Sequence, residues 1–167
     1  MKKVYKCEDC NLDYILDKKI AVIGYGIQGR AQALNLRDSG CDVVIGNMND
    51  TYKESAEEDG FTVMTIERAI EHSDITLLLI PDESHKHIFE KYVSTKGKPD
   101  QLFIIAHGYS VKYNKFKLPP GIDICMLAPR APGEPIRTNY LNEKGIPAFV
   151  DVIQDSSGNA LNKVLAI

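Results

Sequence analysis

The chain has 167 residues, of which 44% are hydrophobic and 26% charged, and its formal net charge is −3. This length is enough for one domain with a real core, and the slightly acidic balance offers no basic cluster of the kind that binds nucleic acid. No apolar run approaches the ~20 residues needed to span a membrane. The N-terminus also lacks the apolar core of a signal peptide, so we expect a cytoplasmic protein.

Strand-like and helix-like segments alternate along the chain. Strands are predicted at 19–24, 43–45, 61–64, 75–80, 102–106, 123–128 and 147–153, and helices at 27–39, 51–59, from 65, from 82 and from 159. This alternation favours an α/β fold of the Rossmann type, doubly wound, with a mostly parallel sheet and helices on both faces. Residues 19–167 would form this domain. Residues 1–18 would be an N-terminal extension packed on it, with Leu12, Ile15 and Leu16 in a short helix.

The glycine-rich stretch after the first strand is the clearest functional signal. It has the pattern G-x-G-x-x-G, between a buried strand and a helix, which is the context of a dinucleotide-binding loop. The first glycine permits a tight turn, the second lets a pyrophosphate approach the backbone, and the third brings helix and strand close together. The helix N-terminus then offers free amides to the phosphates. The predicted cofactor-binding residues here are Gly24, Tyr25, Gly26, Ile27, Gln28 and Gly29.

Polar clusters follow four other strands, at the sheet edge where ligands of open α/β folds bind. They are Asn47 to Lys53, Pro81 to Glu83, His107 with Gly108, and Pro129 with Arg130. Because they converge on one edge, we expect His107, and less directly Arg130, to be catalytic. The other histidines, His72, His85 and His87, fall in helical stretches and are expected on the surface.

The cysteines do not form a metal-binding pattern. Cys7 and Cys10 make a single C-x-x-C, whereas a zinc site needs a second pair, and Cys41 and Cys125 belong to separate strand-like runs. A redox C-x-x-C normally opens a helix after a strand, and no clear strand precedes this one. We therefore expect reduced cysteines without a common role and no metal site in this chain.

Several motifs together resemble the N-terminal part of ketol-acid reductoisomerases. They occur in order over nearly the whole chain, at Val4–Tyr5 with Leu12, 19–29, 31–40, 79–83, 106–108, 126–129, 132–133, 145–148 and 154–158. The resemblance implies an NADP-binding Rossmann domain, with NAD as an alternative cofactor. It adds Asn47, Asp50, Thr51, Lys53, Pro81, Asp82, Gly108 and Gly133 to the expected cofactor-binding residues.

The same resemblance implies an activity for a complete enzyme. The family rearranges an acetohydroxy acid with the help of magnesium and reduces the product with NADPH, in the biosynthesis of valine, leucine and isoleucine. Its magnesium ligands belong to a helical C-terminal domain, before which this chain ends. We therefore expect the chain to hold the nicotinamide dinucleotide without catalysing alone. Magnesium and the acetohydroxy acid would bind only in a complete enzyme.

Three departures from the family pattern bear on function. Ile27 and Arg30 replace Ser and His in the glycine loop, and Arg30 would face either phosphate or solvent. Arg130 stands where the family has an active-site lysine, and Glu134 stands where it has histidine. The loop after the second strand carries Asp50 and Lys53 but no arginine for a 2′-phosphate.

Two other interpretations remain open from the sequence. The chain could be a diverged, non-catalytic module that binds a dinucleotide or a protein. It could instead be an imine or β-hydroxyacid reductase with the same fold. The apolar face of the last helix, with Leu161, Val164 and Leu165, predicts either docking on a following part of the protein or self-association. We expect no nucleic acid and no membrane as partners.

Overall fold

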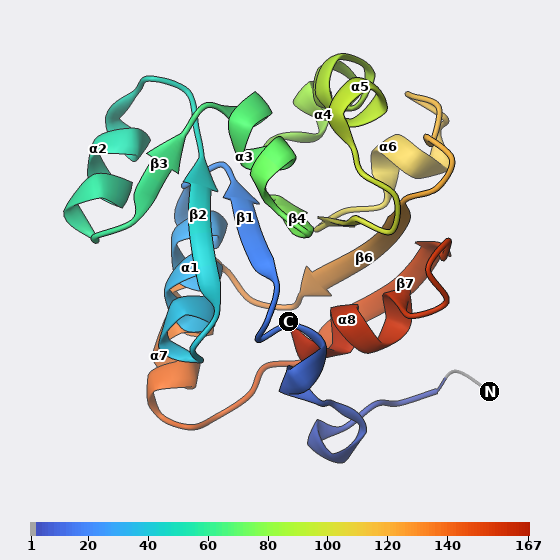
Figure 1. The fold of residues 1–167 in the computed structure, drawn as a ribbon. Coiled ribbons are helices and arrows are strands. Elements are labelled where there is room, and N and C mark those ends of the chain that lie inside the picture. Colours follow the sequence, from blue (N-terminus) through green and yellow to red (C-terminus); the bar gives the residue numbers. More distant parts are fainter. Residues whose placement is uncertain (1–2) are drawn as a thin grey trace.

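The computed structural model describes residues 3–167 and contains one central sheet (Figure 1). The sheet has seven strands in the order β3-β2-β1-β4-β5-β6-β7. In chain order these are β1 (Lys19–Ile23), β2 (Asp42–Gly46), β3 (Thr62–Met64), β4 (Ile75–Leu78), β5 (Leu102–Ile105), β6 (Asp123–Pro129) and β7 (Ala148–Gln154). All neighbouring strands are parallel except β7, which runs antiparallel to β6. The predicted Rossmann-type, mostly parallel sheet is confirmed.

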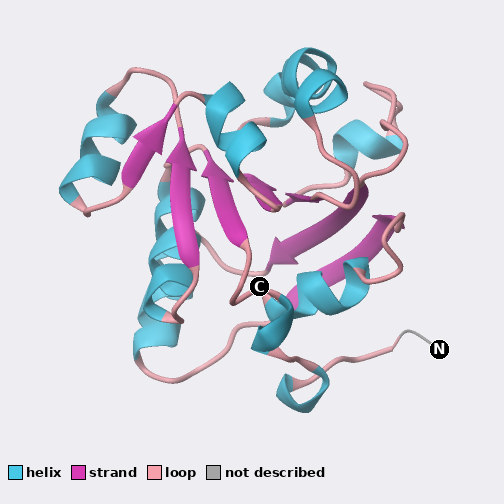
Figure 2. Cartoon of the chain, viewed as in Figure 1, coloured by secondary structure: helices cyan, strands magenta, loops and turns pink. Residues whose placement is uncertain are grey.

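Helices cover both faces of this sheet (Figure 2). They are α1 (Ile27–Asp38), α2 (Thr51–Glu58), α3 (Ile66–His72), α4 (Asp82–Ile88), α5 (Ser94–Lys96), α6 (Tyr109–Lys112), α7 (Gly133–Leu141) and α8 (Ala160–Ala166). A π-helical turn, η3 (Phe89–Val93), joins α4 to α5, and the 3-10 turns η1 (Cys7–Asp9) and η2 (Leu12–Tyr14) precede β1. No helix among the described residues combines the length and apolarity needed to cross a membrane.

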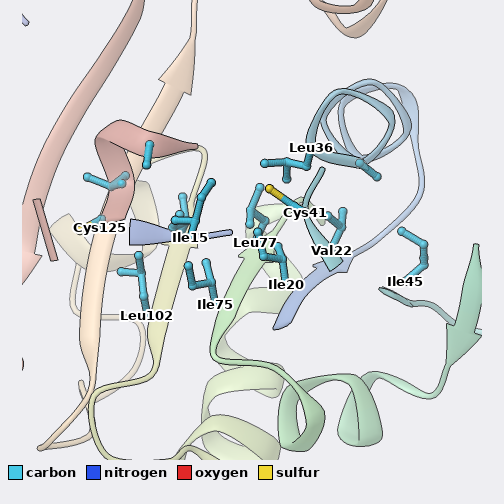
Figure 3. Packing of buried hydrophobic residues seen from close by; sticks show 14 of the residues in the cluster. Ile15, Ile20, Val22, Leu36, Cys41, Ile45, Ile75, Leu77, Leu102 and Cys125 are labelled. Atoms are coloured by element: carbon cyan, nitrogen blue, oxygen red, sulfur yellow. The ribbon is translucent and has the colours of Figure 1, made fainter. Parts of the chain in front are cut away.

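Two apolar cores lie on opposite faces of the sheet, and β1 contributes to both. Ile20 and Val22 face one core with Leu36 of α1 and Val164 of α8, part of which Figure 3 shows. The alternate residues of β1 face the second core, on the side of α3 and α4. A strand buried on both sides must be apolar at every position, which explains the continuous apolar run in β1.

The N-terminal extension and the last helix pack against each other and the first core. Ile15 is fully buried in that core, whereas Leu12 and Leu16 are largely exposed. The short helix expected around these residues is the 3-10 turn η2. In α8, Val164 is buried and Leu161 is half-buried, so this domain itself covers much of the apolar face of α8. The first two residues of the extension lie outside the described part of the chain.

Two helices were missing from the sequence prediction. Both α6 and α7 lie in stretches to which the sequence analysis assigned no helix or strand. In α7, Pro132 is the N-cap and Pro135 falls in the first helical turn. A helix does not need the amides of its first turn for its own hydrogen bonds, so proline is tolerated there. Proline-rich composition therefore hid a helix that packs on α1.

Candidate dinucleotide site at the carboxyl edge of the sheet

The three glycines of the loop after β1 have different surroundings. Gly24 has φ +90°, and a Cβ atom there would lie 2.7 Å from the Leu79 carbonyl oxygen. A Cβ at Gly29 would overlap the carbonyl group of Gly24, so these two positions close the turn and pack α1 on β1. At Gly26, in contrast, no atom lies within 4 Å of where a Cβ would be. The space next to Gly26 is open.

The N-terminus of α1 begins at this open position. Its N-cap is Gly26, no side chain caps it, and its first turn contains no acidic residue. Ile27 is 73% exposed. The first amides of a helix have no partner within the helix, and the helix dipole makes this end partly positive. The arrangement suits an anionic group such as a pyrophosphate.

The side chains of Tyr25 and Arg30 are engaged elsewhere. The Tyr25 hydroxyl donates to Asp59 Oδ2 at 2.8 Å, and its side chain is buried. Arg30 donates twice to the same carboxylate, at 2.6 and 2.9 Å, and this contact holds the pKa of Asp59 below its usual value. Of the two alternatives for Arg30, the structure agrees with a surface residue, because its side chain is 56% exposed while paired with Asp59. The buried side chain of Tyr25 leaves only its backbone facing the site.

The loop after β2 is organised by Asp50. Its carboxylate accepts hydrogen bonds from the amides of Tyr52 and Lys53, which makes Asp50 rather than Thr51 the cap of α2. Asn47 Nδ2 donates to the same oxygen at 2.7 Å. Lys53 Nζ lies 3.3 Å from Asn49 Oδ1, within the loop. Asn47, Asp50, Thr51 and Lys53 are thus gathered where β2 ends.

A groove of about 400 Å³ lies beside the glycine loop, between α1, α2 and α7. Its lining includes Gly26 and Ile27 from the loop, and Tyr52 and Ser55 from α2. Sequence reasoning did not select Tyr52 or Ser55. The only signal for them was their position in the first turns of the helix after β2, next to residues that were selected.

The ends of β4 and β5 bring Asp82 and His107 together. Asp82 Oδ2 lies 2.9 Å from His107 Nδ1, although the two residues are 25 positions apart. Pro81 is the N-cap of α4, and Gly108 is the N-cap of α6. The His107 side chain is 69% exposed at the edge of the sheet. The structure therefore places these predicted residues in one cluster.

His85 is a correction to the sequence prediction. We expected it on the surface, but it is 1% exposed, and burial lowers the pKa of its imidazole. Its Nδ1 lies 3.7 Å from Asp82 Oδ1. The spacing Asp82, His85, Ile88 places these residues on one face of α4, so helical periodicity contained the signal for the burial. His87 is exposed as expected and His72 is half-buried.

Arg130 follows β6, and Gly133 begins α7. The Arg130 guanidinium lies over the ring of Phe149, 5.1 Å from its centroid, and no contact joins it to His107 in the described chain. A Cβ at Gly133 would overlap the backbone of Ile27, so this glycine allows α7 to approach α1. Gln28 Nε2 donates to the Ala131 carbonyl at 3.0 Å, which ties the loop after β6 to the glycine loop.

Comparison with known proteins places the whole chain in context. Residues 14–167 match the family model "Acetohydroxy acid isomeroreductase, NADPH-binding domain". A "Ketol-acid reductoisomerase (NADP(+))" from Pyrobaculum calidifontis is 44% identical over 100% of this chain and 51% of its own length, and one from Caldivirga maquilingensis is 40% identical over the same shares. The chain thus spans about half the length of these curated relatives.

Solved structures agree with this match. An NADH-preferring ketol-acid reductoisomerase from an uncultured archean has a TM-score of 0.95 and 37% identity, covering 99% of this chain and 52% of the other. A semialdehyde dehydrogenase NAD-binding protein from Cupriavidus necator has a TM-score of 0.73 at 18% identity, covering 90% of this chain and 58% of the other. The second likeness shows the fold alone.

Proposed function

The chain belongs to the acetohydroxy acid isomeroreductase family, also called ketol-acid reductoisomerase, and corresponds to its NADPH-binding domain; from this premise we propose which of its residues hold the cofactor. The pyrophosphate of a nicotinamide dinucleotide lies against the amides of Ile27 and Gln28. The observation that carries this proposal is the uncapped N-terminus of α1 with open space at Gly26. A bulky side chain at Gly26 would occupy that space.

The two halves of the dinucleotide would extend along the carboxyl edge from this point. β1 lies between β2 and β4, where the strand order reverses, and ligands of open α/β sheets bind at such a point. We assign the adenosine half to the side of Asn47, Asp50, Thr51 and Lys53. The nicotinamide half is assigned to the side of Pro81, Asp82 and Gly108. A reduced nicotinamide would supply a hydride when bound, and His107 would be an exposed polar group of the chain at that side of the edge.

The activity of a complete reductoisomerase is a further proposal. In this proposal an acetohydroxy acid is the substrate, and His107 faces it. Among residues 3–167, no three His, Cys, Asp or Glu side chains form a group suited to a metal ion. The proposal assigns magnesium binding to residues outside this chain because the family resemblance implies it. Self-association of the complete protein through α8 is likewise a proposal.

Arg130 favours a second candidate function, dinucleotide binding without turnover. Its guanidinium is engaged on Phe149, and arginine does not replace a lysine as a compact point charge. Glu134 adds a negative charge in the first turn of α7. In this second case the site would keep the cofactor contacts of the glycine loop, while Arg130 would contribute nothing to the reaction.

Gly26→Val tests the proposed pyrophosphate site. NADPH and NADH are titrated by fluorescence against wild type and variant. We expect the dissociation constant to rise by at least about a hundredfold, or about 2.7 kcal/mol, because the new side chain occupies the phosphate space. The fold should persist, because the Gly26 backbone has φ −69° and no neighbour lies within 4 Å.

Gly145→Val is the matched control for this test. Gly145 also has open space at its Cβ position, and it lies in the loop before β7, away from the glycine loop. The control should bind like wild type. Equal affinities of wild type and Gly26→Val would place the pyrophosphate elsewhere and refute the proposal.

A further inference from the structure

His85 is a buried side chain for which the proposed cofactor site gives no role. It lies on α4 with 1% of its surface exposed, and among the described residues neither ring nitrogen makes a hydrogen bond of good geometry, although the backbone of Ile80 lies close enough to favour the charged imidazole. Burial lowers the pKa of the imidazole, so the ring is neutral near pH 7 and carries one N–H. A buried N–H without a partner is costly, and each such group in a folded protein calls for an explanation.

The group nearest to His85 in the functional cluster is Asp82. His85 Nδ1 is 3.7 Å from Asp82 Oδ1, which is longer than a hydrogen bond but within range of one after a small side-chain movement. The other charged or titratable groups that act on His85 are Glu83 and His107. Among the described residues, the carboxylates that act on this imidazole, Asp82 and Glu83, both belong to α4 itself.

Asp82 connects the buried ring to the exposed one. One carboxylate oxygen faces His85, and the other lies 2.9 Å from His107 Nδ1. The backbone is also fixed, because the buried Ser110 of α6 donates its hydroxyl to the Asp82 carbonyl at 3.2 Å. An exposed ion pair alone holds its geometry weakly. A second contact, from the buried His85 to Asp82, would restrict the carboxylate to the rotamer that reaches His107.

The contact with Asp82 decides which nitrogen of His107 carries the proton. A carboxylate accepts hydrogen bonds, so Nδ1 must donate and Nε2 is left with its lone pair toward the open edge. The Tyr109 amide lies 3.4 Å from the same Nδ1, which would require Nδ1 to accept. The carboxylate contact is 0.5 Å shorter (3.4 against 2.9 Å) and involves a charge, so it prevails.

We propose that His85 is a positioning residue: its Nδ1–H holds one oxygen of Asp82, so that the other oxygen keeps the proton of His107 on Nδ1 and presents Nε2 at the site. This inference rests on the proposed function, in which His107 faces the reacting part of the bound molecules. His85 touches neither cofactor nor substrate. It acts through Asp82, across the boundary between the core and the exposed edge.

The test observes the tautomer of His107 directly. Long-range ¹H–¹⁵N spectra of the imidazoles distinguish Nδ1–H from Nε2–H, and the chain has only four histidines. In wild type we expect the spectra to show the Nδ1–H tautomer of His107, whereas imidazole free in water favours Nε2–H. His85→Leu, which removes the donor, should shift His107 toward the Nε2–H form.

Two amide variants separate positioning from packing. His85→Asn places an N–H donor near the former Nδ1, and should restore the wild-type pattern of His107. His85→Gln places its donor farther out and should restore it poorly. His87→Asn, on the exposed side of the same helix, is the control and should change nothing. If the leucine variant fails to fold, the comparison of the Asn and Gln variants decides.

Two outcomes overturn the inference. One is a wild-type His107 tautomer in His85→Leu, and the other is an identical tautomer in the Asn and Gln variants. NADPH titration of the wild type separates this inference from the proposed function. Failure to bind NADPH refutes the cofactor site and leaves the tautomer result standing, whereas binding with an unchanged tautomer refutes only the role of His85.

Discussion

The two edges of the sheet treat their polar groups in opposite ways. At the amino edge, the fully buried Asp123 accepts hydrogen bonds from the amides of Ser156 and Ser157, from the Ser157 hydroxyl and from Lys163. Nearby, Gln101 Nε2 donates to two backbone carbonyls at 2.8 and 2.9 Å. At the carboxyl edge, no side chain caps α1, His107 is exposed, and in the described chain the buried ring of His85 makes no hydrogen bond of good geometry.

The difference suggests that the polar groups at the amino edge of the sheet stabilise the fold, whereas those at the carboxyl edge bind ligands. Saturated buried polar groups fix the chain where they occur, and removing one partner leaves the others uncompensated. Polar groups that remain unsatisfied in a folded protein point to a ligand or a functional role. Removing a saturated polar group at the amino edge should therefore change stability and spare binding, and substitutions at the open positions of the carboxyl edge should do the reverse.

Asp123→Ala should have the largest effect. It leaves Lys163, whose side chain is 14% exposed, without its charged partner at 2.9 Å, and breaking a buried ion pair costs about 3–5 kcal/mol. Urea unfolding followed by circular dichroism measures the loss. The affinity for NADPH, measured at a temperature where the variant is folded, should stay within about twofold, or roughly 0.4 kcal/mol.

Acid titration provides a second measurement on the same residue. Burial alone would raise the pKa of Asp123, but the hydrogen bonds from Ser157 and Lys163 outweigh it and hold the pKa below its usual 3.8. A lowered pKa contributes stability above that usual value, and the contribution is lost as the pH falls through the pKa of the folded state. Wild type should therefore lose stability below pH 3.8 more steeply than Asp123→Asn. Parallel curves would contradict this.

The glycine loop contains both kinds of position: Gly24 is needed for the fold, and Gly26 is open for binding. Gly24→Ala should destabilise the fold by about 2 kcal/mol, because its φ is +90° and the new Cβ would lie 2.7 Å from a backbone oxygen. Gly26→Ala should leave the melting temperature unchanged, because its Cβ position is open. Thermal unfolding of both variants tests this. A loss at Gly26 equal to that at Gly24 would show that the open position is structural.

Much of the fold could be predicted because its signals are local. β4 and β5 are buried along their whole length and β1 from Ile20 on, so their residues there are apolar or, at Thr76, β-branched; the glycine pattern determines the turn after β1 by itself. The helix α7 could not be recognised by composition, because its prolines occupy positions that need no amide donor. The predicted strand ends differ from the observed ones by one or two residues, because the sequence does not mark the ends of regular elements sharply.

The site was less predictable because it depends on partners distant in sequence. Tyr25 and Arg30 looked available until the fold brought Asp59 to them, 29 positions after Arg30. His85 was expected on the surface because it falls in a helical stretch, although its spacing from the buried Ile88 placed it near the apolar face of α4. The carboxyl-edge cluster of Asp82 and His107 was predicted correctly, since parallel strands must end at one edge.

Asp50→Ser addresses the smallest effect, the choice between NADPH and NADH. A 2′-phosphate near the end of β2 would meet the carboxylate of Asp50, and Lys53 is shared with Asn49. We therefore expect wild type to discriminate by less than about tenfold, or ~1.4 kcal/mol. Serine can still cap α2, so the variant should shift preference toward NADPH by about twofold to threefold, or roughly 0.5 kcal/mol, by removing repulsion alone.

Both dissociation constants are measured at one low ionic strength, because salt screens exposed charges. Glu54→Ser, which removes a charge farther along α2, is the control and should shift the ratio less. A strong wild-type preference for NADPH would mean that Lys53 or Thr51 already binds the phosphate, and that Asp50 is a helix cap without influence on the cofactor.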